Sequence, residues 1–574
     1  MNKLWHADEM PVRQSPATEY FDLGIYQRDV STDSSDAQVW FNRGLIWAYA
    51  FNHLESAFCF EQAILFDPKC AMAYWGLAFA LGPNYNKPWE LFDGQDLSVS
   101  TTRAHVAMLE AQNQKDRASP VEKALIDALM QRYPQRQPCG DCATWNAQYA
   151  AAMTSVYQKF PEDLDVVALY VDSLMNLTPW QLWDLSTGLP SPQARTSEAK
   201  VALERILTQE RALQHPGLLH LYIHLMEMSP TPELAIPTAD YLRGLVPDAG
   251  HLEHMPSHLD ILCGDYRRAI ISNTSAIRAD EKFLARRETG HFYNLYRCHD
   301  YHFRMYASML SGQSKIAIDT ANLLAESVSD DLLRVKSPPM GDWLEGFIGA
   351  RVHALIRFGR WDSILALALP TDADLYCVTI AMIHYGRGIA YAATGCLKEA
   401  KREEVLFAAA HSRIPSSRTI FNNLCVDILG VAALMLRGEI AYRQGMYDEA
   451  FALLRRAVET DDNLPYDEPW GWMQPSRHAL GALLLEQNRV QEAMDVYAAD
   501  LGLDDSLPRA LTHPNNIWSL HGYHECLVKM KKHAEAQAIQ PHLRSAMAFA
   551  DVSINSSCFC RLETDTSACI EQSL

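Results

Sequence analysis

Residues 37–70, AQVWFNRGLIWAYAFNHLESAFCFEQAILFDPKC, decide the fold of this chain. The stretch is 34 residues long, and small and aromatic residues stand where the two helices of a helix-turn-helix unit must touch. With Ala37 at place 1, the marker residues at places 4, 8, 11, 24, 27 and 32 are Trp40, Gly44, Trp47, Phe60, Ala63 and Pro68. The stretch is therefore predicted to form two packed helices.

This unit resembles the tetratricopeptide repeat, and its register recurs along the chain. Repeats are predicted at 216–249 and 250–283 and from about residues 381, 431 and 474, with a weaker one at 298–331. A single repeat cannot bury its own apolar face, so consecutive repeats stack. The predicted fold class is all-α: a tetratricopeptide-like helical solenoid, that is, a superhelix of helix-turn-helix pairs.

Composition divides the predicted solenoid into segments. They are an N-terminal arm (1–36), N-terminal helical repeats (37–183), a loop or linker (184–198), central histidine-rich repeats (199–331), C-terminal repeats (332–545) with an aromatic insertion near 463–473, and a C-terminal tail (546–574). Insertions in solenoids form loops, often on the binding side. The insertion holds Trp470 and Trp472, and two similar Pro-Trp loops hold Trp89 and Trp180. We expect these loops either to cover a groove as lids or to fasten loops to the solenoid edge.

Histidines return at the same places in the first helix of neighbouring repeats. His220 and His224 stand at places 5 and 9 of one repeat, and His254 and His258 stand at places 5 and 9 of the next. An i, i+4 pair lies on one stripe of a helix. Because packed helices lie roughly 8–10 Å apart, two such pairs can converge on one point. Pro256, however, suits the first turn of a helix and would leave His254 just before it.

Several blocks resemble a family of long tetratricopeptide-repeat-like proteins of bacteria and fungi that carry a histidine-rich HMPSH block. The blocks are FNHLE (51–55), CAMAYWG (70–76), GPN (82–84), NLTPW (176–180), HMPSH (254–258) and LPYDEP (464–469). The resemblance covers most of the chain, from about residue 40 to about residue 530. It implies the solenoid fold, and it implies that places 2, 5, 9 and 12 of the first helices face the concave groove. It implies no particular chemistry.

A cluster of imidazoles in a groove favours a transition metal. The predicted metal ligands are His220, His224, His254, His258 and His302. Glu227, at place 12, is predicted to act as a general base, or instead to orient an imidazole N–H. Imidazoles with one carboxylate suit Fe(II), which we favour, and also Cu, Zn or Mn. Two alternatives stay open: a metal-free acid/base or substrate pocket, and a peptide-binding groove.

Substrate contacts are predicted at the remaining groove places and in the aromatic loops. These residues are His251, His299, Trp470, Trp472, Arg477, His478, Asn84 and Trp89. Arg477 and His478 reach the site only if the superhelix curls back. The predicted function is a metal-dependent enzyme that acts on a small organic molecule, with oxidation as the preferred reaction. The rival function is a non-enzymatic repeat scaffold that binds a partner peptide in the groove.

Composition limits the partners and the compartment. Lys plus Arg is 50 and Asp plus Glu is 70, giving a net charge of −20, which disfavours nucleic acid and anionic membranes as partners. The sequence contains no apolar run that is long and uncharged enough to predict a membrane span, and its N-terminus has no apolar signal core. A soluble cytoplasmic protein is therefore expected. Most of the 13 cysteines are expected to be buried. Cys139 and Cys142 form a lone CxxC. A zinc site would need a second pair at a fitting spacing, and the nearest candidates, Cys558 and Cys560, are far away in sequence.

Overall fold

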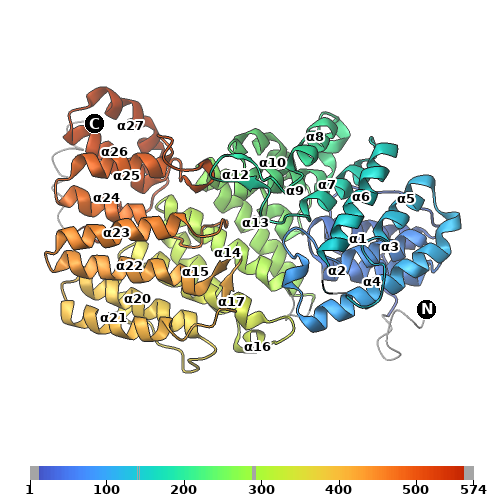
Figure 1. Ribbon diagram of the computed structural model, residues 1–574, viewed down its shortest axis with the longest axis horizontal. Helices are drawn as coiled ribbons and strands as arrows, with labels where there is room; N and C mark the ends of the chain where they lie inside the picture. Colours follow the sequence, from blue (N-terminus) through green and yellow to red (C-terminus); the bar gives the residue numbers. More distant parts are fainter. Residues whose placement is uncertain (1–11, 139, 141, 288–291, 562–574) are drawn as a thin grey trace. The chain divides into compact units, whose positions relative to one another are not determined.

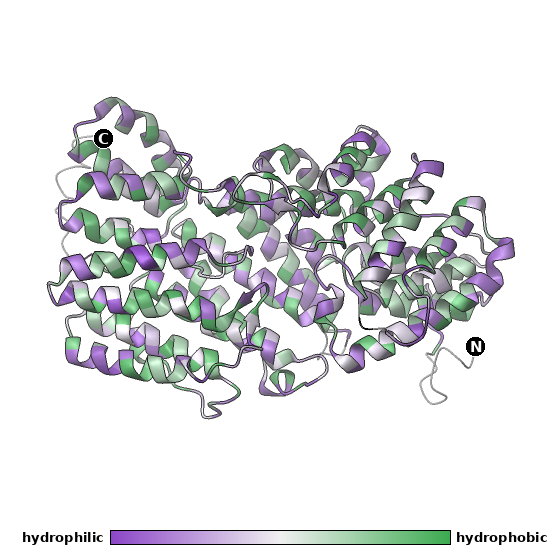
Figure 2. Ribbon diagram, in the orientation of Figure 1, coloured by the Kyte–Doolittle hydropathy of each residue, from purple (hydrophilic) through white to green (hydrophobic). Residues whose placement is uncertain are grey.

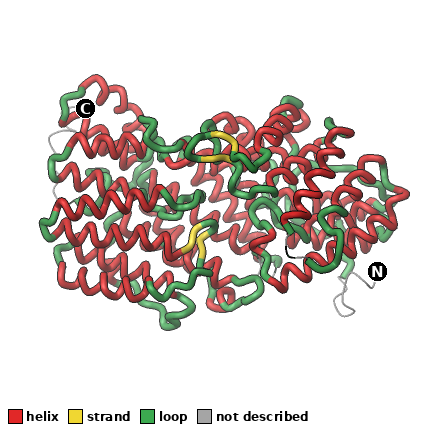
Figure 3. The backbone as a smooth tube through the Cα atoms, in the orientation of Figure 1, coloured by secondary structure: helices red, strands yellow, loops and turns green. Residues whose placement is uncertain are grey.

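The structure is a computed structural model that describes residues 12–138, 140, 142–287 and 292–561 (Figure 1). The chain forms two compact units. Unit 1 comprises Met1–Leu259 and Ser275–Glu288, and unit 2 comprises Asp260–Thr274 and Thr289–Leu574. Helices dominate both units, and the described strands form two short antiparallel hairpins (Figure 3). The predicted all-α fold of helical repeats is confirmed.

Unit 1 is a succession of helices joined mostly by short turns. Its helices are α1 (Ser35–Tyr49), α2 (His53–Phe66), α3 (Ala71–Ala80), α4 (Gly94–Gln114), α5 (Pro120–Leu129), α6 (Ala143–Lys159), α7 (Leu164–Met175), α8 (Thr196–Ile206), α9 (Pro216–Glu227), α10 (Ile236–Leu242) and α11 (Gly250–His254). The short 3-10 helices are η1 (Trp89–Leu91), η2 (Lys115–Arg117), η3 (Glu210–Gln214) and η4 (Pro232–Ala235), and the hairpin is β1 (Trp183–Asp184) with β2 (Leu189–Pro190). Both α12 (Pro256–Leu262) and α13 (Tyr266–Leu284) contribute residues to each unit.

Unit 2 continues with the same kind of helix pair. Its helices are α14 (Tyr293–Leu310), α15 (Ser314–Ser327), α16 (Asp330–Leu333), α17 (Met340–Gly349), α18 (Arg351–Arg357), α19 (Trp361–Leu365), α20 (Cys377–Ala393), α21 (Leu397–His411), α22 (Cys425–Arg443), α23 (Tyr447–Asp462), α24 (Ser476–Glu486), α25 (Val490–Leu501), α26 (Ile517–Lys529) and α27 (His533–Met547). The hairpin is β3 (Thr419–Ile420) with β4 (Asn423–Leu424), and η5 is Arg509–Leu511. Figure 1 shows α20 to α25 stacked as successive layers.

Close contacts between helices explain the marker residues of the repeat. A Cβ atom placed on Gly44 would lie 2.9 Å from the Phe60 ring, and one placed on Gly76 would lie 2.3 Å from the same ring. Phe60 of α2 therefore fills a space between α1 and α3 that only glycine leaves open. In unit 2, Tyr497 of α25 packs in the same way against a glycine of α24 and a glycine of α26. The same repeat packing therefore operates in both units.

The predicted repeats correspond to helix pairs whose boundaries are shifted by a few residues. The weaker repeat predicted at 298–331 is the pair α14–α15, which begins at Tyr293. Pro256 begins α12, as its place in a first helical turn predicts. His254 is the last residue of α11, so it lies inside a helix and not before one. The first helix of that repeat is divided at Met255 into α11 and α12, but Met255 keeps helical backbone angles (φ −50°, ψ −40°), and the rings of His254 and His258 still meet.

Apolar and polar residues alternate along the helices of both units, as expected of helices with one buried face (Figure 2). Within unit 1, the described part of the N-terminal arm is held against α7 by ion pairs of Arg28, whose guanidinium lies 2.8 Å from Asp163 and 2.6 Å from Asp165. Among the helices that the structure describes, none is both long and apolar enough to cross a membrane.

Candidate metal centre

Three histidine side chains meet in the interior of unit 1. His220 and His224 lie one turn apart on α9, and His251 lies on α11. Their ligand nitrogens all lie within 4.8 Å of one another, and the three residues are 0%, 0% and 1% exposed. The i, i+4 spacing puts the two rings of α9 on one stripe, and α11 supplies the third ring. We call His220, His224 and His251 the three-histidine group.

Each ring from α9 is oriented by an acceptor at its Nδ1 atom. Nδ1 of His220 lies 2.7 Å from the carbonyl oxygen of Tyr49, and Nδ1 of His224 lies 3.0 Å from Oε1 of Glu227. We assign the ring proton to Nδ1 in both cases, because a carbonyl and a carboxylate only accept. Each Nε2 then carries a lone pair, and neither has a hydrogen-bond partner among the described residues. This is the pattern of metal-binding histidines, whose second nitrogen donates to an orienting group.

Burial keeps these rings in the form that binds metal. It lowers the pKa of His220 well below its ordinary value, and the neighbouring His224 adds to the shift. Burial also lowers the pKa of His224 well below its ordinary value, with a further contribution from His258. Both rings are therefore neutral near pH 7, and a neutral imidazole has a lone pair to donate.

Aromatic rings cover the three-histidine group. The Phe51 ring centroid lies 4.4 Å from that of His220, and the Phe51 ring stacks on those of His224 and His251 at 5.8 and 5.6 Å. Phe51 comes from the turn between α1 and α2, far from α9 in sequence. A ring of this size on one side of the group excludes water from it.

Tyr85 and Trp180 flank the same group. Their ring centroids lie 5.0 and 5.9 Å from that of His224. Phe51 has a φ angle of 55° and Trp180 one of 59°, and among the described residues of unit 1 these are the non-glycine residues with positive φ. Such a conformation costs about 1–3 kcal/mol per residue and is concentrated at functional sites. Unit 1 therefore holds two strained aromatic residues against its imidazoles.

A second imidazole pair lies beside the three-histidine group. Nε2 of His254 lies 2.7 Å from Nε2 of His258. Nδ1 of His258 lies 3.0 Å from Oε2 of Glu227, whose other oxygen meets His224. Ring centroids 5.9 Å apart join the pair to the group, from His258 to His224 and from His254 to His251. Five imidazoles of unit 1 therefore gather near one buried carboxylate.

Glu227 lies between a ring of the three-histidine group, His224, and a ring of the second pair, His258. In this position its carboxylate can orient both imidazoles. Its predicted role as a general base stays a prediction. Of the predicted substrate residues, Asn84 lines a small cavity of about 10 Å³ together with Phe51 and His220, and its Oδ1 accepts from the Lys87 backbone N–H at 2.8 Å. The Trp89 indole N–H donates to Asn146 of α6 at 3.2 Å.

Sequence reasoning missed Phe51, Tyr85 and the Tyr49 carbonyl. The blocks FNHLE (51–55) and GPN (82–84) carried a signal for two of them, because they adjoin or contain residues that reach the imidazoles. Nothing in the local sequence marks a backbone carbonyl as a histidine's partner.

The other predicted site residues belong to unit 2. His302 lines a buried cavity of about 20 Å³ together with His353, which is room for one water molecule. Burial lowers the pKa of each of these rings to about 3, and His353 contributes to the shift at His302. The His299 ring packs against those of Phe303 and Phe421, at 5.3 and 4.7 Å.

The aromatic insertion forms part of the interior of unit 2. Trp470 and Trp472 are 9% and 2% exposed, and Trp470 stacks on Tyr306 at 5.5 Å. Arg477 makes a two-fold contact with the Asp462 carboxylate, with one N–O distance of 2.7 Å. These contacts fit the interpretation that the loop is fastened to its repeats. Substrate binding by these residues stays a prediction.

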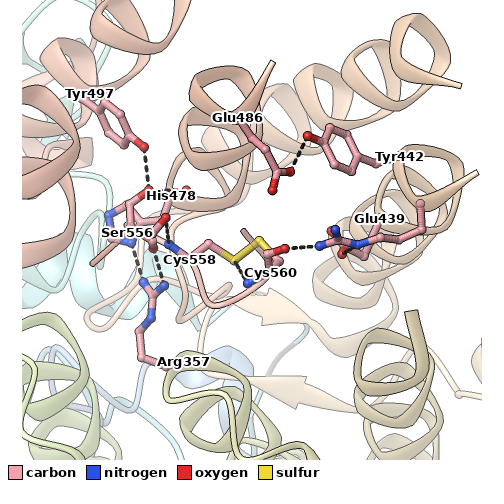
Figure 4. The surroundings of a disulfide bond; sticks show 11 residues. Arg357, Glu439, Tyr442, His478, Glu486, Tyr497, Ser556, Cys558 and Cys560 are labelled. Carbon is pink, nitrogen blue, oxygen red and sulfur yellow. Dashed lines mark hydrogen bonds and ion pairs between the residues drawn. A yellow bond between two sulfur atoms is a disulfide. The ribbon is translucent and has the colours of Figure 1, made fainter. Parts of the chain in front are cut away.

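His478 lies in a hydrogen-bonded network of unit 2, partly drawn in Figure 4. Its Nε2 lies 3.0 Å from Oδ2 of Asp500, and its Nδ1 lies 2.7 Å from a guanidinium nitrogen of Arg357 (Figure 4). Asp500 also accepts from His513 and Asn516 at 2.9 Å each and from Ser519 at 2.6 Å. We call these six residues the Asp500 network. Both ring nitrogens of His478 and both carboxylate oxygens of Asp500 have partners.

A disulfide between Cys558 and Cys560 lies beside this network (Figure 4). The sequence did not predict it, because two cysteines separated by one residue were considered only as distant zinc ligands. The hydroxyl of Ser557 donates to the His478 carbonyl oxygen at 2.7 Å, so the disulfide segment reaches the network directly. Most of the other described cysteines are buried, as expected. Cys139 lies outside the described residues, and with it the predicted CxxC.

No protein-family model matches the sequence, and no curated protein matches it. Solved structures that it resembles are helical repeat proteins. A chain of the APC/C hetero-tetramer Cut9–Hcn1 is 14% identical over 83% of this chain and 75% of that chain, with a TM-score of 0.32. Human IFIT1, as a dimer with m7Gppp-AAAA, is 12% identical over 90% of this chain and 97% of that one, with a TM-score of 0.32. A Rap protein complexed with competence and sporulation factor is 13% identical over 67% and 98%, with a TM-score of 0.29. At these identities the likeness concerns the fold alone.

Proposed function

We propose that unit 1 binds a first-row transition-metal ion and that the protein is a metal-dependent enzyme acting on a small organic molecule. The observation that supports this most is the pair of oriented Nε2 lone pairs on His220 and His224, buried without a hydrogen-bond partner among the described residues. His251 completes a set of three imidazoles whose ligand nitrogens all lie within 4.8 Å of one another. A buried polar atom left without a partner costs about 1–3 kcal/mol, and a bound ion removes that cost.

His215, on the same helix as His220 and His224, shows what a structural histidine looks like here. It is the N-cap of α9 and is fully buried. Its Nδ1 accepts from the Leu218 backbone N–H at 3.1 Å, and its Nε2 lies 3.2 Å from Asp165. Both of its nitrogens are used within the protein, so it offers no lone pair to an ion.

The donor set favours an ion that accepts imidazole. Fe(II) is our first choice, because imidazole suits it and because the proposed reaction is an oxidation; Cu and Zn accept the same donors, and Mn, which prefers oxygen ligands, is the weakest candidate. When bound, such an ion would act as a Lewis acid or a redox centre. The chain's own residues would orient the ligands, through Tyr49 and Glu227, and would exclude water, through the rings of Phe51, Tyr85 and Trp180.

The rival function is a non-enzymatic repeat scaffold that binds a partner peptide. The stacked helix pairs of both units favour it, because solenoids of this kind present long surfaces to their partners. A groove at the predicted places would need accessible side chains at those places, whereas His220, His224 and His251 are buried. A partner site would therefore have to use other places of the repeats.

Metal analysis of protein purified without a histidine tag tests the proposal. Wild-type protein should retain a transition metal after dialysis, and the double variant His220→Ala, His224→Ala should lose it while keeping its helical circular dichroism spectrum. The matched control is His215→Asn, which removes a buried histidine of the same helix and keeps a capping side chain. Metal content that is the same in the double variant and the control would end the proposal. If protein without metal captures a peptide partner, and the double variant captures it equally well, the scaffold function is favoured.

A further inference from the structure

We propose that the substrate of unit 1 is a small amino acid, with its carboxylate at Arg132 and its ammonium group at Asp172. The inference rests on the proposed function and names the substrate class for the same unit. Its starting point is a pair of oppositely charged side chains, both buried in unit 1, that keep polar atoms without a hydrogen-bond partner among the described residues. An amino acid carries the two complementary charges in one molecule.

Arg132 is a fully buried cation. It follows α5 and is 0% exposed, and none of its three guanidinium nitrogens has a hydrogen-bond partner in the described chain. Its guanidinium carbon lies 4.1 Å from the ring centroid of Tyr149 on α6. Such a cation–π contact is worth about 2 kcal/mol when desolvated, but a ring face does not satisfy N–H donors that point outward in the guanidinium plane. An anion that accepts from these donors would offset the cost of burying the charge.

Arg28, in the same unit, shows how a structural arginine is satisfied here. Its terminal guanidinium nitrogens donate to the carboxylates of Asp163 and Asp165, at 2.8 and 2.6 Å. Those carboxylates come from the protein itself, so Arg28 needs no ligand. Arg132 carries the same charge in a more buried place without such a contact.

Asp172 of α7 is the negative counterpart. It is 5% exposed, and its Oδ1 accepts from the Asn176 amide at 2.9 Å, whereas its Oδ2 has no partner among the described residues. Burial raises the pKa of Asp172 to about 6, and nearby Arg132 opposes the rise, so the carboxylate is ionised at pH 7. Arg132 and Asp172 therefore influence each other without hydrogen-bonding to each other.

A small cavity joins Asp172 to the three-histidine group. It measures about 10 Å³ and is lined by Asp172, His53 and His220, among others. Nδ1 of His53 lies 3.2 Å from the Gly82 carbonyl oxygen, which assigns the ring proton to Nδ1 and leaves a lone pair on Nε2. Burial lowers the pKa of His53 to about 4, so this ring is neutral, and its Nε2 has no partner in the described chain.

The cavity therefore offers acceptors, and Arg132 offers donors. An ammonium group has three N–H donors and is about as large as the single water molecule for which the cavity has room. Water there would satisfy Asp172 and His53 but would leave the charge of Arg132 uncompensated. A plain carboxylate would compensate Arg132 but would leave two negative charges beside one positive charge. An amino acid meets both ends and leaves no net charge buried.

Thermal shifts of the full-length protein, stripped of metal, test the inference. The probes are glycine and β-alanine, which carry both charges, acetate, which carries the carboxylate alone, and methylammonium, which carries the ammonium alone. The melting temperature of wild type should rise with glycine or β-alanine, and less with either single-charge probe. Asp172→Asn should reduce the rise with the amino acids to that with acetate. Arg132→Met should lose the response and so measures the general stabilisation that osmolytes give.

The ligand-free melting temperatures separate binding from a structural role. Arg132→Met should melt at or above the wild-type temperature, because it removes an unpaired buried cation. Arg132→Gln, which is polar and uncharged, should also lose the response to the amino acids. Arg28→Met is the matched control: it leaves Asp163 and Asp165 without their ion pairs, so it should melt at a lower temperature and keep the response to glycine.

The outcomes separate this inference from the proposed function. A rise with acetate equal to that with the amino acids overturns the amino acid as the ligand. A rise that persists in both Arg132 variants, or variants of Arg132 that melt lower than wild type or do not fold, assigns Arg132 a structural role and also overturns it. Wild type that retains metal but responds to no probe overturns this inference and leaves the proposed function standing. Wild type that responds to glycine but retains no metal overturns the proposed function and leaves the amino acid as a ligand of unit 1.

Discussion

Glu227 of unit 1 and Asp500 of unit 2 are both buried beside imidazoles, and the rings around the two carboxylates are used in opposite ways. In unit 1, five imidazoles gather near Glu227, and two of them keep an Nε2 atom without a hydrogen-bond partner in the described part of the chain. In unit 2, the Asp500 carboxylate accepts from two imidazoles, an amide and a hydroxyl. The number of buried histidines therefore does not mark a metal site. Around these two carboxylates, the difference is whether the second nitrogen of each ring is used by the protein.

The charges support the same distinction. Burial opposes the ionisation of Asp500, but the facing rings of His478 and His513 hold its pKa well below the usual range. Burial also lowers the pKa of Arg357 to about 9. A charged carboxylate surrounded by donors is a stable arrangement as it stands, whereas neutral rings with open lone pairs gain from a cation.

The largest expected effect of this difference is on stability in unit 2. Asp500→Ala removes the acceptor of four side-chain hydrogen bonds and leaves their donors buried, so unfolding should become easier by about 3–5 kcal/mol. Urea unfolding followed by tryptophan fluorescence measures the loss. The exposed Asp504→Ala is the control and should change little. Metal content should be the same in Asp500→Ala as in wild type; loss of metal from a variant that remains folded would mean that the two clusters are not separate in function.

The next effect is on metal affinity in unit 1. Glu227→Gln keeps the size of the side chain but removes the charge that orients His224 and His258, so affinity for the ion should fall about 10–100-fold. Competition with a chelator of known affinity measures it. The matched control is Glu403→Gln in unit 2, which alters the carboxylate beside His384. An affinity unchanged by Glu227→Gln would remove Glu227 from the proposed site.

The surroundings of the histidines in the two units also show what the sequence could and could not predict. Repeat spacing predicted the helix pairs, and the i, i+4 pattern predicted that His220 and His224 share a face, because both depend on contacts within one helix or between neighbours. The partner of His220 is the carbonyl of Tyr49, 171 residues away, and no local pattern contains it. His478 has the same register as the histidines of unit 1, yet Asp500 and Arg357 engage both of its nitrogens. Register fixes the face of a helix; it does not fix what lies across from that face.

A third effect is the pH dependence of stability. Burial lowers the pKa of His478 to about 4, against about 6.5 in an unfolded chain. Below pH 6.5 the unfolded state binds a proton that the folded state does not, so stability falls as the pH falls, until the folded ring also protonates near pH 4. This ring alone should cost about 2 kcal/mol between pH 7 and pH 5. His478→Gln should show a shallower decline over the same interval, measured by urea unfolding at each pH. An equal decline in both proteins would mean that other groups dominate it.

The smallest expected effect concerns the disulfide beside the Asp500 network. Cys558 and Cys560 are two positions apart, so their bond closes a very short loop and restricts the unfolded chain little. On loop entropy alone, the double variant Cys558→Ser, Cys560→Ser should lose about 1–2 kcal/mol. The loss should be visible in unfolding experiments, and wild type treated with a reductant should match the variant. Metal content should not change in either, because the segment contacts His478 of the Asp500 network. Exchange of a single cysteine is a poorer test, because it leaves a free thiol. A loss as large as that of Asp500→Ala would instead mean that the disulfide holds Ser557 in place for the network, and that unit 2 depends on its C-terminal segment as strongly as on its buried carboxylate.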